Sequence, residues 1–362
     1  MLQPDQIRPL ARALTHTTNS YKFLWLQALL DTAEQQREQI PLDDLLVAMV
    51  ARAWKLTQFH RLRLGHYDQL QRLCGAIAAR TGLPPNAAPT QVVRRLRADP
   101  ELLGQSRALA RYVPQRFLAP WFERELRGVP EAKKDRAITT LAAEHRETER
   151  AAPYSLERTG LYVMLDPAWS VWARTHMTFL RAYVEREFAE FLQDRNPGSP
   201  AVLRKIRGET RRNLARARRF WGPLAAQPGG LRDFYADAAL ELNGAHYDHV
   251  LPWAFVAHDL LWNLVPTTSA INIAKSARIP DPDAYLGWLA DWQFEALQAQ
   301  PATAQDLLID HAEFLGLEEP RTIRDLPRSD FSQRFEDRFR PHLIAALNAG
   351  FTGSWRYAPA EL

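Results

Sequence analysis

The sequence predicts a mainly α, multi-helical protein that carries a small module of two strands and a helix near its C-terminal third. Apolar residues recur at helical spacing along most of the chain, as in YKFLWLQALLDT near its start. Residues 246–280 instead change from short strand-like runs to a helical pattern. A length of 362 residues is typical of two or three compact units. We therefore expect a helical protein with one small mixed module.

Residues 1–150 predict an N-terminal all-helical domain. Joints that contain proline, such as LPPNAAP and RGVP, separate its helical segments. The segments with apolar residues at helical spacing are 20–32, 41–56, 67–80, 101–112 and 131–147.

Residues 151–240 predict a second helical block that contains the densest basic run of the chain. An aromatic and aliphatic stripe from Trp169 to Leu192 indicates the buried face of one long helix, which QDRNPGSP ends. The basic residues that follow are Arg204, Lys205, Arg207, Arg211, Arg212, Arg216, Arg218 and Arg219, with only Glu209 opposing them. Such a run can follow a phosphate backbone or form a solvated helix face. The chemistry of the segment that follows favours the first interpretation.

The composition sets limits on the partners of this protein. The net charge of +4 is a weak indication of a polyanionic partner. A single cysteine, Cys74, excludes an intrachain disulfide and a zinc site built from cysteine pairs. The first residues lack the apolar core of a secretory signal, and no stretch approaches the length of a membrane span. We therefore expect a cytoplasmic protein without a membrane partner.

Residues 246–280 contain candidates for each task in phosphodiester hydrolysis. His249 can act as a base because an imidazole is mostly neutral at cellular pH. Asp248 precedes it, and consecutive side chains of a strand point to opposite faces. Asn272 and Lys275 share one face of the following helix, and Asn263 lies on the second strand. One carboxylate, one amide and open water positions suit Mg²⁺ or Mn²⁺.

This segment resembles the HNH nuclease family, whose fold is called ββα-metal or His-Me finger. The resemblance rests on DHVLP from residue 248, then Asn263, then Asn272 and Lys275. It implies a nuclease module over 241–281, with Asp248 and Asn272 as metal ligands and His249 as general base. It also implies that Asn263 orients the base and that Lys275 contacts phosphate. Asn272 stands where other members have histidine, a variant that keeps metal binding.

The family implies cleavage of DNA that leaves 5′-phosphate and 3′-hydroxyl ends. The phrases YKFLWLQALL and FLQDRNP further resemble long bacterial HNH proteins of restriction and phage-defence type. They imply an antiviral role and a protein partner or activator in a defence system. Two alternatives stay open. One is a catalytically silent module that binds nucleic acid or a partner, and the other is an RNA nuclease.

Several other residues near the module have two possible roles. His246 can approach the metal or be structural, and Arg278 can contact phosphate or end the helix in solvent. We expect His258 at the surface, and Trp253 and Trp262 in a small core that holds the site. Residues 282–362 predict a C-terminal helical extension, with helical patterns at 283–299, 303–315 and 330–348 and no predicted chemical role.

Overall fold

The computed structural model describes residues 4–15, 17–208 and 212–359. Its residues form two compact units. Unit 1 comprises Met1–Pro197 with Lys205–Gly208, and unit 2 comprises Gly198–Arg204 with Glu209–Leu362. The finer division into four segments at residues 150, 240 and 281 stays a prediction.

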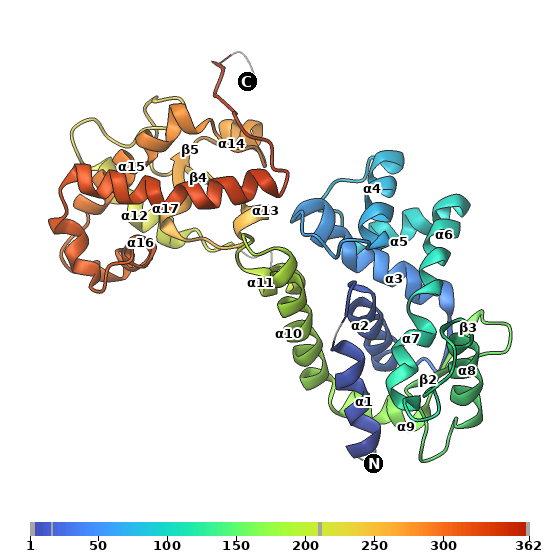
Figure 1. The fold of residues 1–362 in the computed structure, drawn as a ribbon. Helices are drawn as coiled ribbons and strands as arrows, with labels where there is room; N and C mark the ends of the chain where they lie inside the picture. Colours follow the sequence, from blue (N-terminus) through green and yellow to red (C-terminus); the bar gives the residue numbers. More distant parts are fainter. Residues whose placement is uncertain (1–3, 16, 209–211, 360–362) are drawn as a thin grey trace. The chain divides into compact units, whose positions relative to one another are not determined.

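Unit 1 is a helical body built around two almost completely buried helices, α2 and α3 (Figure 1). Phe23, Trp25 and Trp54 are large side chains in its core. The helices of this part are α1 (Pro4–Leu14), α2 (Tyr21–Glu34), α3 (Leu42–Trp54), α4 (Gln69–Thr81), α5 (Pro89–Ala98), α6 (Pro100–Arg107), α7 (Pro114–Leu118), α8 (Glu131–Glu144), α9 (Pro167–Thr175) and α10 (Met177–Arg195).

Two features of unit 1 differ from the expectation of helices alone. An antiparallel sheet of order β1-β3-β2 joins β1 (Gln39–Pro41) to β3 (Tyr162–Leu165) and β2 (Tyr154–Leu156). Its strands are too short to leave a periodic signal, and their pairing is far from local. The long helix expected from Trp169 to Leu192 is divided between α9 and α10 at His176, so the apolar stripe spans two helices.

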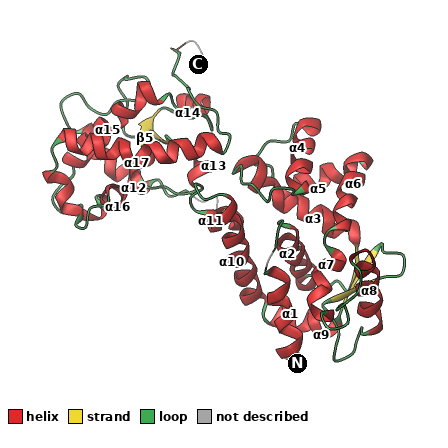
Figure 2. Ribbon diagram, in the orientation of Figure 1, coloured by secondary structure: helices red, strands yellow, loops and turns green. Residues whose placement is uncertain are grey.

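Unit 2 packs helices around a two-stranded antiparallel sheet. Figure 2 shows how much of the protein is helical, in agreement with the predicted mainly α class. Helix α14 contacts β4, α12 contacts β5, and α15 packs on α17. No helix within the described residues is both long and apolar enough to cross a membrane. Helix α11 (Val202–Arg207) has residues in both units. The elements of unit 2 are α12 (Ala215–Ala225), β4 (His246–His249), α13 (Trp253–Val256), β5 (Leu264–Thr267), α14 (Ser269–Lys275), α15 (Pro282–Gln298), α16 (Ile309–Leu315) and α17 (Arg328–Asn348).

Candidate active site

The predicted order of strand, strand and helix is present in unit 2. Strand β4 pairs with β5 in a register that places Asp248 opposite Val265 and His249 opposite Leu264. The Thr268 side chain then accepts a hydrogen bond from the Ile271 amide and caps α14. The loop after β4 also contains the short helix α13. A 3₁₀ turn over Leu261–Asn263 precedes β5, so Asn263 lies just before the second strand and not on it as predicted. This module is the ββα arrangement that the sequence predicted.

Asp248 is buried, and one of its carboxylate oxygens has two partners. Its Oδ2 atom lies 2.9 Å from Lys275 Nζ and accepts a 2.6 Å hydrogen bond from the Tyr235 hydroxyl. Burial first, and the negative charge of Asp248 second, raise the pKa of Tyr235, which therefore remains a donor. No residue that the structure describes donates to the Oδ1 atom. The carboxylate is thus held in one orientation with one oxygen left for another partner.

Lys275 lies inside the module, where it joins the helix to the strand. Its side chain has no exposed surface, and its ammonium donates to the His249 carbonyl oxygen at 2.8 Å as well as to Asp248. Burial lowers the pKa of Lys275, and the nearby Asp248 charge partly offsets this effect. The ammonium is therefore engaged with protein atoms, and the predicted contact with phosphate stays a prediction.

The imidazole of His249 faces the loop that precedes β5. Its Nε2 atom lies 3.0 Å from Asp259 Oδ1 and 3.1 Å from the His258 carbonyl oxygen. Both partners only accept hydrogen bonds, so Nε2 carries the proton of the neutral ring and Nδ1 is left as the proton acceptor. The other carboxylate oxygen of Asp259 accepts a 2.7 Å bond from the Asn213 amide. This geometry fixes one tautomer of the neutral imidazole, with its acceptor nitrogen at Nδ1.

Asn263 is completely buried and holds the backbone two residues after His249. Its Oδ1 atom accepts from the Leu251 amide at 2.8 Å, and its Nδ2 atom donates to the Leu251 carbonyl at 3.0 Å. The Asn263 carbonyl also accepts from the Val250 amide. Asn263 therefore closes the loop that starts immediately after the imidazole.

A second buried layer supports this loop from α15 and α16. Gln293 donates from Nε2 to the carbonyl oxygens of Leu261 and Leu264 at 3.2 and 3.1 Å. The Oε1 atom of Gln293 lies 2.8 Å from Nε2 of the buried His311. Burial lowers the pKa of His311 to about 3, so the ring stays neutral and can donate to this oxygen. Hydrogen bonds from Gln293 thus hold the backbone on both sides of Asn263.

Asn272 and His246 have more open surroundings than the other predicted residues. The Asn272 side chain is half-buried on α14, and it makes no hydrogen bond with the residues that the structure describes. It stands one helical turn before Lys275, which contacts Asp248. His246 is exposed at the start of β4, opposite Thr267. The two possible roles of His246 remain open.

Three further residues of the site were not singled out from the sequence. Asp259 lies in the loop between the two strands, and Tyr235 and Asp233 precede the predicted module. The Asp233 carboxylate accepts bonds from Thr267 Oγ1 and the Thr268 amide, at 2.8 and 2.7 Å. This anchors the segment that supplies Tyr235. These residues contact the site only because of the folded path of the chain, and their spacing in the sequence does not predict those contacts.

Histidine and tryptophan side chains pack around the loop. Trp253 and Trp262 are buried, and Trp262 stacks on Phe314 with ring centroids 4.3 Å apart. His258, expected at the surface, is half-buried against Trp262. Burial lowers the pKa of His258 to about 4, so that its ring is neutral.

The basic run forms no uniform cationic surface. Lys205 is buried, and burial lowers its pKa to about 7. Arg204, Arg212 and Arg218 are exposed, and none of them pairs with a carboxylate among the described residues. Arg211 lies outside the described residues. Three arginines have acidic partners, namely Arg207 with Glu185, Arg216 with Asp310, and Arg219 with Asp306.

Arg278, the last predicted phosphate contact, is half-buried beyond the end of α14. Its guanidinium donates to the carbonyl oxygens of Ala274 and Lys275 and lies 5.7 Å from the Trp355 ring centroid. It therefore binds the free carbonyl groups at the helix end, which satisfies acceptors that the helix itself leaves unpaired. Binding of phosphate by Arg278 and by the exposed arginines of the basic run stays a prediction.

Comparison with known proteins agrees with the geometry of this module. A family model described as HNH endonuclease matches residues 234–281, a segment that begins beside Tyr235 and ends after α14. No match was found among curated proteins or among solved structures. The matched family indicates nuclease activity, and with it a nucleic-acid substrate and a divalent cation. Residues 234–281 of this chain are therefore similar to the HNH endonuclease family.

Proposed function

We propose that this protein is a DNA endonuclease that hydrolyses phosphodiester bonds with His249 as general base and one Mg²⁺ or Mn²⁺ ion. The observation that carries the proposal is the paired placement of Asp248 and His249 on β4. Lys275 orients the carboxylate and Asp259 orients the imidazole. Neighbouring residues of one strand thus present an acceptor for a cation and an acceptor for a proton.

The donor atoms fit a hard cation. The described residues contain no cluster of three or more histidine, cysteine, aspartate or glutamate side chains suited to a metal. The oxygens available near the strand and the helix are those of the Asp248 carboxylate and the Asn272 amide. One carboxylate, one amide oxygen and waters are a set that Mg²⁺ accepts. Asp248, through its Oδ1 atom, and Asn272 would hold the ion. When bound, it would neutralise charge that develops on the phosphate oxygens.

The residues of this chain would divide the remaining work. His249 would take the proton of the attacking water at Nδ1, while Asp259 retains the proton on Nε2 and stabilises the imidazolium that forms. Lys275 and Tyr235 would keep the Asp248 carboxylate in place. Asn263 would hold the loop after His249 and so limit movement of the base.

Products with 5′-phosphate and 3′-hydroxyl ends are part of this proposal. So is a setting in restriction or antiviral defence with an activating partner. The exposed Arg204, Arg212 and Arg218 supply basic groups that could contact the DNA backbone near the module.

A plasmid-nicking assay tests the proposal. Purified native protein is incubated with supercoiled plasmid and Mg²⁺ or Mn²⁺, with and without EDTA, beside the His249→Ala and His246→Ala variants. We expect cleavage that EDTA abolishes and that His249→Ala reduces by about a thousandfold or more, because loss of a general base removes a large part of the rate. A His249→Ala protein that cuts like the native one would falsify the mechanism. An equal amount of single-stranded RNA in the same reactions distinguishes a DNA nuclease from an RNA nuclease.

A further inference from the structure

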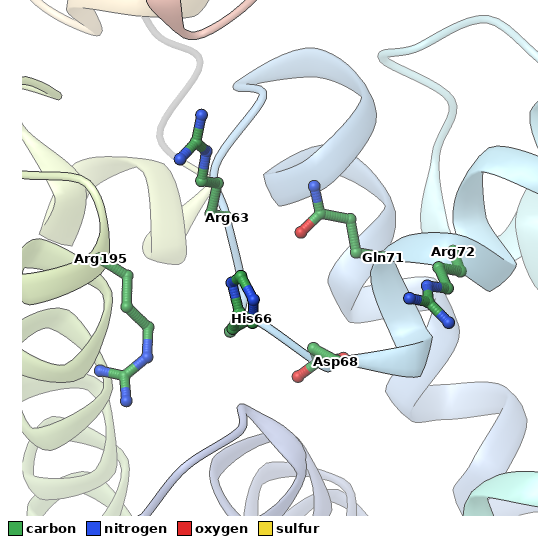
Figure 3. A pocket seen from close by; sticks show the side chains of 7 residues that line it. Arg63, His66, Asp68, Gln71, Arg72 and Arg195 are labelled. Atoms are coloured by element: carbon green, nitrogen blue, oxygen red, sulfur yellow. The ribbon is translucent and has the colours of Figure 1, made fainter.

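Unit 1 contains a pocket of about 470 Å³ whose wall is rich in basic side chains. Figure 3 shows Arg63 and His66 on the loop before α4, Arg72 on α4, and Arg195 at the end of α10. We call this the arginine pocket, defined by Arg63, Arg72 and Arg195. It is built entirely from unit 1 and is formed by other elements than the nuclease module.

The loop that carries Arg63 and His66 is held in place by hydrogen bonds to Asn196 and by close packing against residues 18 and 19. The Asn196 side chain accepts from the Arg63 amide at 2.8 Å and donates to the Arg63 carbonyl at 2.9 Å. Gly65, with φ of +144°, passes so close to residues 18 and 19 that a Cβ atom would lie 2.9 Å from Asn19 Oδ1. The pocket wall is therefore preformed, which lowers the entropic cost of binding a ligand.

The positive charge of the pocket is not neutralised within the described part of the chain. Arg63, Arg72 and Arg195 pair with no carboxylate among these residues, whereas other arginines of unit 1 do, such as Arg80 with Asp99 at 2.7 Å. Three guanidinium groups around one pocket repel each other, and an anionic ligand relieves this repulsion.

One acidic residue, Asp68, also lines the pocket, but its oxygens are engaged elsewhere. Its Oδ2 atom accepts from the amide and the hydroxyl of Ser20 at 2.9 and 2.7 Å, and its Oδ1 atom accepts from the Leu70 amide at 2.9 Å. Only 3% of the residue is exposed. Asp68 therefore caps α4 and ties it to α2, and the accessible part of the wall remains cationic.

Arg195 is the most firmly held of the three arginines. Its guanidinium lies 3.6 Å from the centroid of the Phe191 ring and donates to the carbonyl oxygens of Phe191 and Thr17 at 2.9 and 3.3 Å. A guanidinium fixed in this way presents its remaining N–H groups in a defined direction, and its planar fork matches the oxygens of phosphate.

We propose that the arginine pocket binds the phosphate groups of a small phosphorylated molecule, such as a nucleoside diphosphate or triphosphate. Three guanidinium groups match the charge of a diphosphate better than that of a single carboxylate. The volume lies in the range of sites for small molecules, and a recessed pocket suits a compact ligand better than a continuous DNA backbone. The protein would thus carry a ligand site separate from its nuclease module.

Calorimetric titration of the full chain with inorganic pyrophosphate and with ATP, both in EDTA, tests this proposal. Arg72→Gln and Arg63→Gln change exposed side chains, so thermal unfolding should be close to that of the native protein. We expect saturable binding to the native protein, weakened roughly ten- to a hundredfold in each variant, as for loss of a charged hydrogen-bonding partner. Arg94→Gln, another exposed arginine without an acidic partner among the described residues, should bind like the native protein.

Three results would overturn the proposal. The first is the absence of binding of both probes to the native protein at millimolar concentration. The second is binding that Arg278→Gln in the nuclease module removes while Arg72→Gln and Arg63→Gln leave it intact. The third is loss of affinity for a short DNA duplex in the two pocket variants with ATP binding unchanged, which would assign these arginines to a DNA contact.

Discussion

Nε2 of His249 lies 3.0 Å from the Asp259 carboxylate, although the two residues are separated by the whole loop that contains α13. Through this contact, the Asp259 carboxylate orients the His249 imidazole, and no contact of Asp259 with substrate is needed for that effect. Asp259 is therefore a positioning residue.

Asp259→Asn should lower kcat of DNA cleavage by about 10- to 100-fold, the usual effect of losing a residue that orients a ligand or base. The amide can turn its NH₂ group toward Nε2 and favour the wrong tautomer. Initial rates of plasmid nicking at several DNA concentrations separate kcat from KM, and KM should change little. Asp283→Asn, at an exposed position on α15, is the matched control. A native kcat in Asp259→Asn would remove Asp259 from the mechanism.

Asn272→Ala should leave the protein folded but raise the Mg²⁺ concentration needed for half-maximal cleavage by about tenfold or more, since one ligand of the ion is lost. The side chain is half-buried and makes no hydrogen bond with described residues, so its removal exposes no unpaired group. Cleavage rates over a Mg²⁺ titration measure the effect, and Asn243→Ala at an exposed site is the control. Coincident titration curves would exclude Asn272 as a ligand.

Lys275→Met should destabilise unit 2 by about 3–5 kcal/mol, because it leaves the buried Asp248 carboxylate without its cationic partner. Urea unfolding followed by tryptophan fluorescence measures the change, with Lys133→Met at an exposed position as the control. If Lys275→Met lowers cleavage and leaves stability unaltered, the ammonium acts on the substrate and not on the protein.

Asn263→Ala should lower stability by about 2–5 kcal/mol, since the buried amide and carbonyl of Leu251 would each lose a partner. Cleavage should fall with it, because the loop after His249 is no longer closed. Chemical unfolding and nicking are measured on one preparation. If Asn263→Ala and the native protein unfold at the same urea concentration, the hydrogen bonds between Asn263 and the Leu251 backbone do not stabilise the protein.

His311 should make the free energy of unfolding of unit 2 depend on pH. As the pH falls from about 6.5 to about 3, this free energy should decrease by about 1.4 kcal/mol for each pH unit. Burial holds the pKa of His311 near 3 in the folded protein, below the value of a free histidine. The unfolded chain therefore binds a proton in this range that the folded chain does not, so stability is lost as the pH falls. His311→Gln keeps a donor for Gln293 and removes the titration. The stability difference between this variant and the native protein should change over the same pH range and stay constant above pH 7.

The nuclease module could be predicted from the sequence because its order and spacing are local. Asp248, His249, Asn263 and Lys275 all lie within one short segment. Lys275 contacts Asp248 and the His249 carbonyl, and Asn263 bonds the Leu251 backbone two residues after His249. The direction of the Lys275 side chain could not be predicted, because residues of one helix face can point to solvent or into the protein.

Contacts between distant segments account for the rest of what the sequence left open. The acids that neutralise Arg216 and Arg219, Asp310 and Asp306, come about 90 residues later in the chain. A charge run therefore looks more basic in the sequence than on the folded surface. The same reason applies to the pairing of β1 with β3, whose strands carry no periodic pattern of useful length.

Tyr154 has a consequence for the order in which the chain acquires its structure during synthesis. Its hydroxyl accepts from Trp25 Nε1 at 2.9 Å and donates to the Pro114 carbonyl at 2.5 Å, in the core of unit 1. The early helices therefore lack a buried hydrogen-bonding partner until a segment more than a hundred residues downstream has left the ribosome. A nascent chain that ends before Tyr154 keeps the Trp25 indole unpaired, so its helices should remain loosely packed and open to proteases until β2 and β3 arrive.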